Sequence, residues 1–561
     1  MKKSNSSGRR LLVIAGIVLA VIACGVGGWN YFKYRLIKHK MSNLLYKNTN
    51  GLYTVEYDSL FVDEVAGVLS VTNLRLIPDT ARYRQLHDDH QHAPALLVGV
   101  SIPRLHITGV KTPKAVINRE IEGSRIAISN ADIVLYHARP QHDPDKDSTK
   151  NPSLQETLLQ LLNKLSHIKA DTVSVDNTSL SYVDFIDDEQ RIKGASVSLH
   201  LYDILIDSTS VGDTSRFLFA RRGDINLHQV IINDKKGFYH YTADTIGFNT
   251  AGRSLTIKDF RVVPLLGEDA TMRAAGFQTD RFDFHCGTIS LKNLDLPQLM
   301  NGAIFADTLL IAQGRFNIYR DLSYPRSGKN MVGKFPHQAL MKLPVPYRLN
   351  KVVVPDAYIE YKERNPRSDS SGRLQLYHST VVFSHFTNID SLLAKDNLCT
   401  LSFHSRFLNM ATLKATIVLK LKDPHGRFTV KGSVSGFDAP GLNVMLRPVA
   451  LVEAEKGHIG GLEFALDCDN YTSRGKLVLL YNDLKVSVFK KDTKGKKLKE
   501  KKLVSLIANM VVKDANPGRK DKGTPRVENI DYKRDTTRSF FNMIWKSMLS
   551  GVKQTVGVER Q

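Results

Sequence analysis

The chain has 561 residues, of which 42% are hydrophobic and 24% are charged, so a largely disordered protein is excluded. Its formal net charge of +22 favours anionic partners such as nucleic acid, phospholipid head groups or lipopolysaccharide, without choosing among them. The four cysteines form no CxxC pair, so neither a disulfide framework nor a cysteine-based zinc or redox site is predicted.

The N-terminal segment has the composition of a membrane span. Residues 11–28 are uncharged, follow four basic residues and precede an aromatic cluster that begins at Trp29. Together with these aromatics, the stretch approaches the ~20 residues needed to cross a bilayer, and aromatic rings favour the membrane–water interface. We predict a single-pass anchor at 11–32 between a cytoplasmic tail at 1–10 and a juxtamembrane segment at 33–50. The residues assigned to the anchor are Leu11, Val13, Ile17, Leu19, Ile22 and Trp29.

The sequence leaves two alternatives to an uncleaved anchor with a cytoplasmic N-terminus: a lipidated Cys24 and the opposite orientation. The tetrapeptide at 21–24 fits a loose lipobox, in which Cys24 would be lipidated, although the apolar run continues past that cysteine. Basic residues flank the span on both sides, so the positive-inside rule discriminates weakly between the two orientations. The short N-terminal tail favours insertion with the tail inside and the body on the far side of the membrane.

Residues 69–78, with the sequence LSVTNLRLIP, combine two phases of strand alternation. Leu69 and Val71 share one face of a strand, but the next apolar pair begins one residue out of phase, after Asn73. A β-bulge or kink at Asn73 would return the later side chains to the same face, because Asn and Asp tolerate the backbone conformations that a kink requires. Residues 255–264, LTIKDFRVVP, match this stretch by residue type at all ten positions.

The eight-residue core of this pattern recurs along the chain. Its order is apolar, any, apolar, any, Asn or Asp, apolar, any, apolar. Composition alone would give roughly two such matches, so the excess indicates a degenerate internal repeat in which each unit is a bent strand that curls its sheet. Ordinary strand-to-turn transitions in an unrelated β domain remain the alternative. Further copies begin at Ile126, Leu199, Ile289, Val352 and Leu479, and a looser one begins at Val173.

The remaining sequence supports a mainly β fold. Residues 411–437 alternate, turn at an Asp-Pro-His-Gly sequence and alternate again, which is typical of a β-hairpin. Amphipathic helices are predicted within 151–168 and 538–552, and a short one near 503–512. No strand–helix–strand pattern recurs, so a parallel α/β sheet is not supported. The predicted fold is an elongated, curled antiparallel β-sheet with an N-terminal transmembrane helix and a few amphipathic helices.

Polar stretches divide the chain into segments. A β-rich body is predicted at 51–489, with a subdivision that could fall near 137–170, where polar and turn-forming residues concentrate. A lysine run opens a linker with a short helix at 490–534. A C-terminal amphipathic helix and tail follow at 535–561.

Four features of the chain resemble those of the AsmA-like proteins of Gram-negative envelopes, a group that includes TamB-like and YhdP-like relatives. They are the N-terminal anchor and the sequences at 53–79, 472–489 and 540–552. The resemblance implies an inner-membrane anchor and a periplasmic body shaped as an elongated groove with an apolar interior. It also implies a role in moving or holding phospholipid between the two membranes, and it offers no catalytic residues. The chain is shorter than the long bridging members of that group.

The absence of common catalytic motifs favours a non-enzymatic protein. The sequence lacks the GxxxxGK[ST], GxSxG and HExxH motifs. His and Asp residues at 87–92 could bind zinc, but their position between a turn and a proline favours a solvated loop. We therefore predict no catalytic residues, no metal site and no cofactor.

The basic and apolar residues near the C-terminus have competing interpretations. The lysine run is either a solvated segment or a membrane-surface patch, in which each lysine near anionic head groups contributes about 1 kcal/mol. The apolar stripe of the C-terminal helix either touches the bilayer or packs on the β body, and packing is preferred. A nucleic-acid site is not predicted, because the lysine run lacks interleaved aromatics. The membrane-surface candidates are Lys490, Lys491, Lys496, Lys497, Phe540, Phe541, Ile544 and Trp545.

Two functions fit these features. The first is binding or transport of phospholipid or another anionic envelope lipid along apolar positions that line an open groove, with the inner membrane as the second partner. The second is a structural or assembly role in the envelope, in which the same positions pack into closed cores and no lipid is carried. The groove candidates are Leu69, Val71, Leu74, Leu76, Leu255, Ile257, Phe260, Val262, Leu291 and Leu294.

Overall fold

The computed structural model describes most of the predicted β body and the C-terminal helix. The described residues are 51–63, 65–88, 96–110, 120–137, 167–184, 189–207, 210, 213, 215–217, 219–368, 370–491, 498–500 and 513–557. Several predictions lie outside them: the anchor at 11–32 with Leu11, Val13, Ile17, Leu19, Ile22, Cys24 and Trp29, most of the 87–92 stretch, most of the helix within 151–168, the helix near 503–512, and Lys496 and Lys497.

The chain forms two compact units, which are described separately. Unit 1 comprises the residues up to Phe260 together with Ser290–Phe305, and unit 2 comprises Arg261–Ile289 and the residues from Ala306 onward. Strands make up 60% of the structure and helices 15%, which confirms the predicted mainly β class. Three strands contribute residues to both units: β11 (Ser254–Pro264), β12 (Arg281–Lys292) and β13 (Ile304–Asp321).

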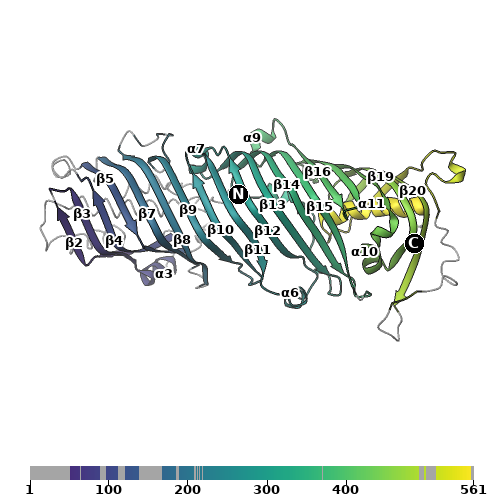
Figure 1. Ribbon diagram of the computed structural model, residues 1–561, viewed down its shortest axis with the longest axis horizontal. Coiled ribbons are helices and arrows are strands. Elements are labelled where there is room, and N and C mark those ends of the chain that lie inside the picture. Colours follow the sequence, from purple (N-terminus) through teal and green to yellow (C-terminus); the bar gives the residue numbers. More distant parts are fainter. Residues whose placement is uncertain are drawn as a thin grey trace. The chain divides into compact units, whose positions relative to one another are not determined.

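Unit 1 is a sheet of successive strands with short helices at its edges (Figure 1). Its elements are β1 (Tyr53–Glu56), β2 (Ser59–Asp63), β3 (Val68–Pro78), α3 (Thr80–Asp88), β4 (Leu96–Thr108), β5 (Glu120–Ser129), β6 (Asp132–His137), β7 (His167–Asp184), β8 (Glu189–Ile206), β9 (Ala220–Asn233), β10 (Tyr239–Asn249) and α7 (Leu296–Met300). β3 pairs with β1, β2 and β4, and β4 pairs with β5 and β6. From β7 to β10 each strand pairs antiparallel with the next.

The sheet of unit 1 is mixed, which corrects the predicted antiparallel arrangement. β5 and β6 both pair with β7 in parallel. The two strands lie end to end along β4 and β7, on either side of Asn130. A parallel pairing needs a crossover of a dozen or more residues, and residues 138–166 supply that length between β6 and β7. The sequence predicted a linker here, but not the direction of the strand that follows it.

Unit 2 is also a succession of strands, and it contains the C-terminal helix (Figure 1). Its elements are α6 (Glu268–Ala275), α8 (Pro336–Leu340), β14 (Tyr347–Arg364), β15 (Ser371–Thr387), α9 (Asp390–Leu393), β16 (Leu398–Phe407), β17 (Ala411–Lys420), β18 (Phe428–Asp438), η1 (Ala439–Leu442), α10 (Asn443–Met445), η2 (Leu446–Ala450), β19 (Val452–Cys468), β20 (Thr472–Lys491), β21 (Leu498–Glu500), η3 (Arg519–Asp521), β22 (Glu528–Lys533) and α11 (Phe540–Val556). β14 to β20 pair antiparallel in sequence order, and β20 also pairs with β21 and β22. The predicted hairpin at 411–437 is confirmed as β17 and β18.

The Asn or Asp of the repeated pattern has a left-handed backbone conformation in every copy, which confirms the predicted kink. L-residues rarely adopt this conformation, and Asn and Asp adopt it most readily after glycine. The strand pairing is interrupted at such positions, with register shifts between Val175 and Thr178 and between Val354 and Ala357. The φ angles are 47° at Asn73, 56° at Asn130, 50° at Asn177, 53° at Asp203, 50° at Asp259, 55° at Asn293, 50° at Asp356 and 50° at Asp483.

Each unit has its own apolar core. In unit 1, inward side chains of adjacent strands form one cluster in which Leu105 and Leu201 are at most 1% exposed. In unit 2, the core includes Phe428 and Leu477 from the strands and Met543 from α11, all again at most 1% exposed. The helix therefore belongs to the folded body of unit 2.

Candidate functional site: the inner face of unit 2

The ten predicted groove residues divide between a closed core and partly covered positions. Leu69, Val71 and Leu74 are 1%, 4% and 7% exposed within the core of unit 1, and Leu294 is also buried. Two further candidates are half-buried and pack against that core, namely Leu76 and Ile257. The remaining candidates are half-buried: Leu255, Phe260, Val262 and Leu291.

The strands of unit 2 carry continuous rows of apolar side chains on the face that α11 covers, here called the inner face. Alternation puts every second side chain of a strand on one face, and direct cross-strand partners share that face. One row runs from β14 to β20 through Val354, Val381, Phe403, Ala415, Gly432, Phe464 and Leu477. A parallel row runs from β14 to β19 through Val352, Phe383, Leu401, Ile417, Val430 and Leu466.

Both rows have half-buried side chains on β15 and β16. The row ends are covered, since Val354 is 9% exposed and Leu477 is fully buried. Between them, Val381, Phe403, Ala415 and Gly432 are half-buried and lie outside the core cluster, and the large apolar side chains among them are those of β15 and β16. Among the described residues, Val381 on β15 and Phe403 on β16 thus form an apolar strip whose surface is partly exposed.

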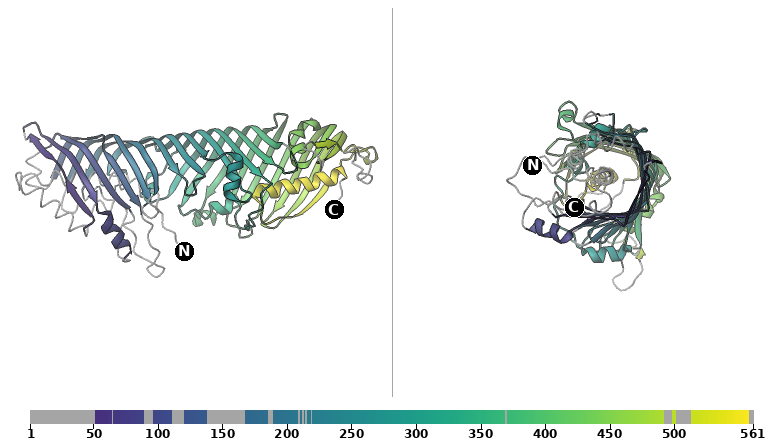
Figure 2. Two further views of the ribbon diagram at one scale, coloured as in Figure 1. Left: turned by 90° about the horizontal axis from the view of Figure 1, so that it is seen from below. Right: turned by 90° about the vertical axis from the view of Figure 1, so that its left-hand side faces the viewer.

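Helix α11 lies along the inner face at the C-terminal end of unit 2 (Figure 2). It begins after Ser539, whose side chain accepts a hydrogen bond from the Asn542 amide at 3.4 Å, as an N-cap does. Gly551 allows a close approach, because a Cβ there would lie 3.1 Å from the Leu477 side chain. The helix thus covers β20 and β22 closely, while Val381 on β15 and Phe403 on β16 stay half-buried.

The four apolar membrane-surface candidates of α11 point in two directions. Phe540 is 7% exposed and Ile544 packs against the core, as the preferred interpretation expected. Phe541 and Trp545, one helical turn apart, are 69% and 51% exposed. The apolar stripe of the helix is therefore wider than the surface that the sheet covers.

Aromatic rings fix the N-terminal end of α11. Phe540 packs against Phe428 and Phe335, with ring centroids 4.5 Å and 5.3 Å away. The guanidinium of Arg534 lies 4.3 Å from the centre of the Phe335 ring, a cation–π distance. The neighbouring His337 is 1% exposed, and neither of its ring nitrogens has a hydrogen-bond partner among the described residues. Burial lowers the pKa of His337 from 6.5 to about 4.

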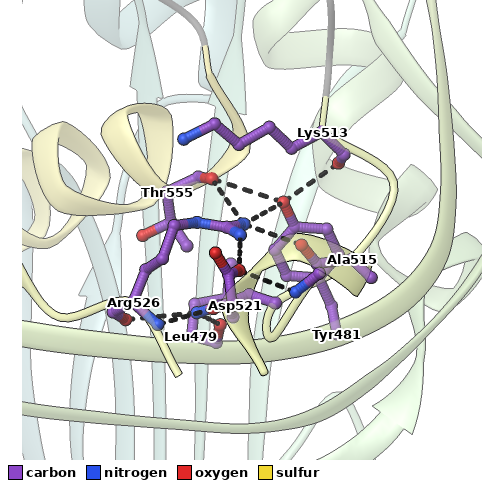
Figure 3. A network of polar contacts seen from close by, with 9 residues as sticks. Leu479, Tyr481, Lys513, Ala515, Asp521, Arg526 and Thr555 are labelled. Atoms are coloured by element: carbon purple, nitrogen blue, oxygen red, sulfur yellow. Dashed lines mark hydrogen bonds and ion pairs between the residues drawn. The ribbon is translucent and has the colours of Figure 1, made fainter. Parts of the chain in front are cut away.

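A polar network fixes the opposite end of α11 (Figure 3). Arg526 donates to the carbonyl oxygens of Ala515 at 2.7 Å and Thr555 at 3.3 Å, and it pairs with Asp521. The Tyr481 hydroxyl lies within hydrogen-bond distance of two carbonyl oxygens, that of Lys513 at 3.0 Å and that of Thr555 at 3.3 Å. A cation is favourable at a helix C-terminus because the last carbonyls there lack intrahelical partners. Both ends of α11 are thus held, so the helix is a fixed part of the inner face.

The opposite face of β15–β20 carries a hollow of about 720 Å³, here called the outer furrow. Two rows of side chains that run across the six strands border it, together with Val527 and with Phe403, Ala415, Gly432 and Phe464 of the intervening row, which belongs to the inner face. The first row is Val382, Ser402, Thr416, Lys431, Ala465 and Lys476, and the second is Thr380, His404, Lys414, Ser433, Glu463 and Val478.

Three further predictions concern the lysine run, a membrane-spanning helix and metal ligands. Lys490 and Lys491 are the last residues of β20 and pair with β21. No helix in the described part of the chain is long and apolar enough to span a membrane. Among the same residues, no three potential metal ligands come together.

Sequence reasoning assigned groove residues to β3, β11, β12 and the segment after β12, and it missed the half-buried strip on β15 and β16. The missed signal is plain alternation: LCTLSFHSRF at 398–407 places Leu401 and Phe403 on one face. On β15 the alternation is interrupted at His378 and His385, both in left-handed conformation, and the repeat pattern admitted only Asn or Asp there.

No protein-family model matches the chain, and a search of curated proteins finds no match to it. The resemblance to AsmA-like proteins consequently depends on the residues that carry it.

Proposed function

We propose that this protein is a membrane-anchored, non-enzymatic envelope protein that binds or transports phospholipid along an apolar β-groove and so supports outer-membrane lipid homeostasis. The observation that carries the proposal is the half-buried apolar strip on the inner face of β15 and β16. Removing apolar surface from water contributes about 25 cal/mol per Å², which favours an apolar ligand on such a strip. Acyl chains suit it, because they need continuous apolar surface and few hydrogen bonds.

The fixed helix α11 supports the same function. Its exposed Phe541 and Trp545 add aromatic surface to the inner face beyond what the sheet covers. Exposed apolar patches on a folded protein often mark ligand or membrane contacts. In this proposal, acyl chains lie between the strip and the exposed flank of α11.

The location is part of the proposal. The span predicted at 11–32 would anchor the chain in the inner membrane with the body in the periplasm, as the resemblance to AsmA-like proteins implies. The same resemblance supports a groove-like, elongated body and phospholipid as the ligand. A body tethered at one membrane is well placed to accept lipid from it.

A structural or assembly role is the second candidate, and the core of unit 1 favours it. Leu69, Val71 and Leu74 were expected to line an open groove, yet each is at most 7% exposed. If unit 2 were equally closed around its apolar face in solution, the protein would carry no lipid and would act through its surfaces.

Lipid carried by the purified protein distinguishes the two functions. The body without residues 1–32 is purified, and bound lipid is extracted and identified by mass spectrometry. We expect phospholipid at a defined ratio to protein, and loss of most of it in Phe403→Asp, which places a charge on the apolar strip. Thr400→Asp is the matched control, because Thr400 lies on the same strand but on the opposite face. Folded protein without acyl lipid, or equal loss in both variants, would favour the structural role.

A further inference from the structure

The outer furrow lies on the face opposite the proposed lipid strip and carries an excess of positive charge. Lys414, Lys431 and Lys476 all border it, whereas Glu463 is its one acidic residue. None of the three lysines forms an ion pair with any described residue. Three lysines against one glutamate leave the furrow with a net positive charge, which favours an anionic ligand there.

The spacing of the lysines follows from the strand register. Lys431 and Lys476 both pair with Ala465, so their backbones lie two strand spacings apart, about 10 Å. Lys414 pairs with Ser433, two residues along β18 from Lys431, which puts it about 8 Å from that lysine. The three ammonium groups can therefore contact successive negative charges of one ligand.

The shape of the furrow favours a narrow, extended ligand. It crosses six strands, and five strand spacings correspond to about 24 Å. An extended polypeptide rises about 3.4 Å per residue, so about seven residues would fill that length. Small side chains such as Ser402 and Ala465 form the floor between the longer lysines. A flat membrane surface would meet the lysine tips and leave this floor empty.

We propose that the outer furrow binds an extended acidic segment of a partner protein. The lysines would pair with its carboxylates, and Val382 on β15 and Val478 on β20 would contact its apolar side chains. Charge complementarity of this kind steers encounter and selects the partner. The inference concerns a different face from the lipid strip and does not depend on lipid binding.

The test measures binding of an acidic probe to the full chain in nanodiscs of zwitterionic lipid. The probe is a fluorescein-labelled heptapeptide in which pairs of glutamates alternate with pairs of valines, so that an extended chain presents both residue types on one face. Its binding is followed by fluorescence anisotropy. We expect the double variant Lys431→Gln, Lys476→Gln to bind it about tenfold more weakly, from two lost charge pairs. Glu463→Gln should bind it more tightly, because a repulsive charge is removed. Lys420→Gln is the matched control: it is exposed on β17 but lies outside the furrow.

Several results would overturn the proposal. Equal weakening in Lys420→Gln and the double variant would assign binding to general positive charge. A probe with glutamine in place of glutamate that binds equally well would exclude charge recognition. If the double variant lost binding to vesicles of anionic phospholipid while keeping the peptide, the furrow would be a membrane-facing surface instead. Thermal unfolding of each variant checks that the fold is retained.

Discussion

Single residues in left-handed backbone conformation set the direction of the strands. At Asn177 the conformation, with φ of 50°, coincides with the register shift between β7 and β8. The residue is exposed, so its side chain contributes little packing. Its role is to permit the bend.

This role predicts how substitutions at Asn177 behave. Asn177→Val should lower the free energy of unfolding by about 1–2 kcal/mol, because a β-branched residue is strained in the left-handed region. Asn177→Gly should change stability little, since glycine adopts that region freely. Urea unfolding followed by circular dichroism measures the difference. Asp171→Val, an exposed position of β7 with ordinary strand geometry, is the control and should stay within about 0.5 kcal/mol of wild type. Equal effects at both positions would contradict the role.

The sequence identified these kinks where they carry Asn or Asp and missed them elsewhere. Gln229, Gln313 and His378 share the conformation, with φ of 54°, 55° and 49°. The repeat pattern admitted only Asn or Asp at the kink, so it passed over these positions, although His also adopts the left-handed region more often than most residues. His378 lies beside Asp356 on β14, 2.6 Å from its carboxylate, so one kink adjoins the next.

The buried His337 makes stability depend on pH. Its pKa is lowered to about 4 in the folded protein, so between pH ~6.5 and ~4 the unfolded chain binds a proton that the folded chain does not. The stability that depends on the neutral ring is present above pH 6.5 and falls as the pH decreases. We expect a loss on the order of 2 kcal/mol at pH 5 relative to pH 7.

The variant His337→Phe isolates this contribution, because phenylalanine keeps an aromatic ring at this position but has no group that binds a proton. Its free energy of unfolding should fall less than that of wild type between pH 7 and pH 5. His404→Phe, at an exposed position of β16, should keep the wild-type dependence. The same slope in wild type and His337→Phe would show that the histidine is not held neutral.

At the scale of elements, α11 shows what periodicity can and cannot predict. Helical spacing predicted the helix and its apolar stripe, but not how much of the stripe the sheet would cover. That depends on the position of β20, which is distant from α11 in sequence but pairs with β22 and contributes Leu477 to the core that the helix covers. Met543 is buried against the sheet and Phe541 is exposed, so substitutions at these two positions test which face of α11 packs against the sheet.

We expect Met543→Ala to destabilise unit 2 by about 2–5 kcal/mol through loss of buried volume, and Phe541→Ala to change stability by less than about 0.5 kcal/mol. In a chain carrying Trp29→Phe, Trp545 is the remaining tryptophan, and its fluorescence follows unfolding around α11. A larger loss for Phe541→Ala than for Met543→Ala would mean that the helix is oriented differently.

At the scale of the whole molecule, the same kinked strand occurs in two units whose apolar faces are covered to different degrees. The kinked strands of unit 1 enclose a closed apolar core, and those of unit 2 leave a half-buried strip beside a fixed helix. The sequence could predict the mainly β class and the repeat, since both are local patterns. It could not predict which strands would be covered, or that β5 and β6 would pair in parallel with β7, because both depend on contacts between distant segments.

Photo-crosslinking in cells tests the central claim most directly. A benzophenone amino acid replaces Phe403 on the inner face or Thr400 on the outer face of the same strand, and crosslinked species are identified by mass spectrometry. The account predicts phospholipid adducts at Phe403 and none at Thr400. Adducts to protein alone at Phe403, or equal lipid adducts at both positions, would contradict it.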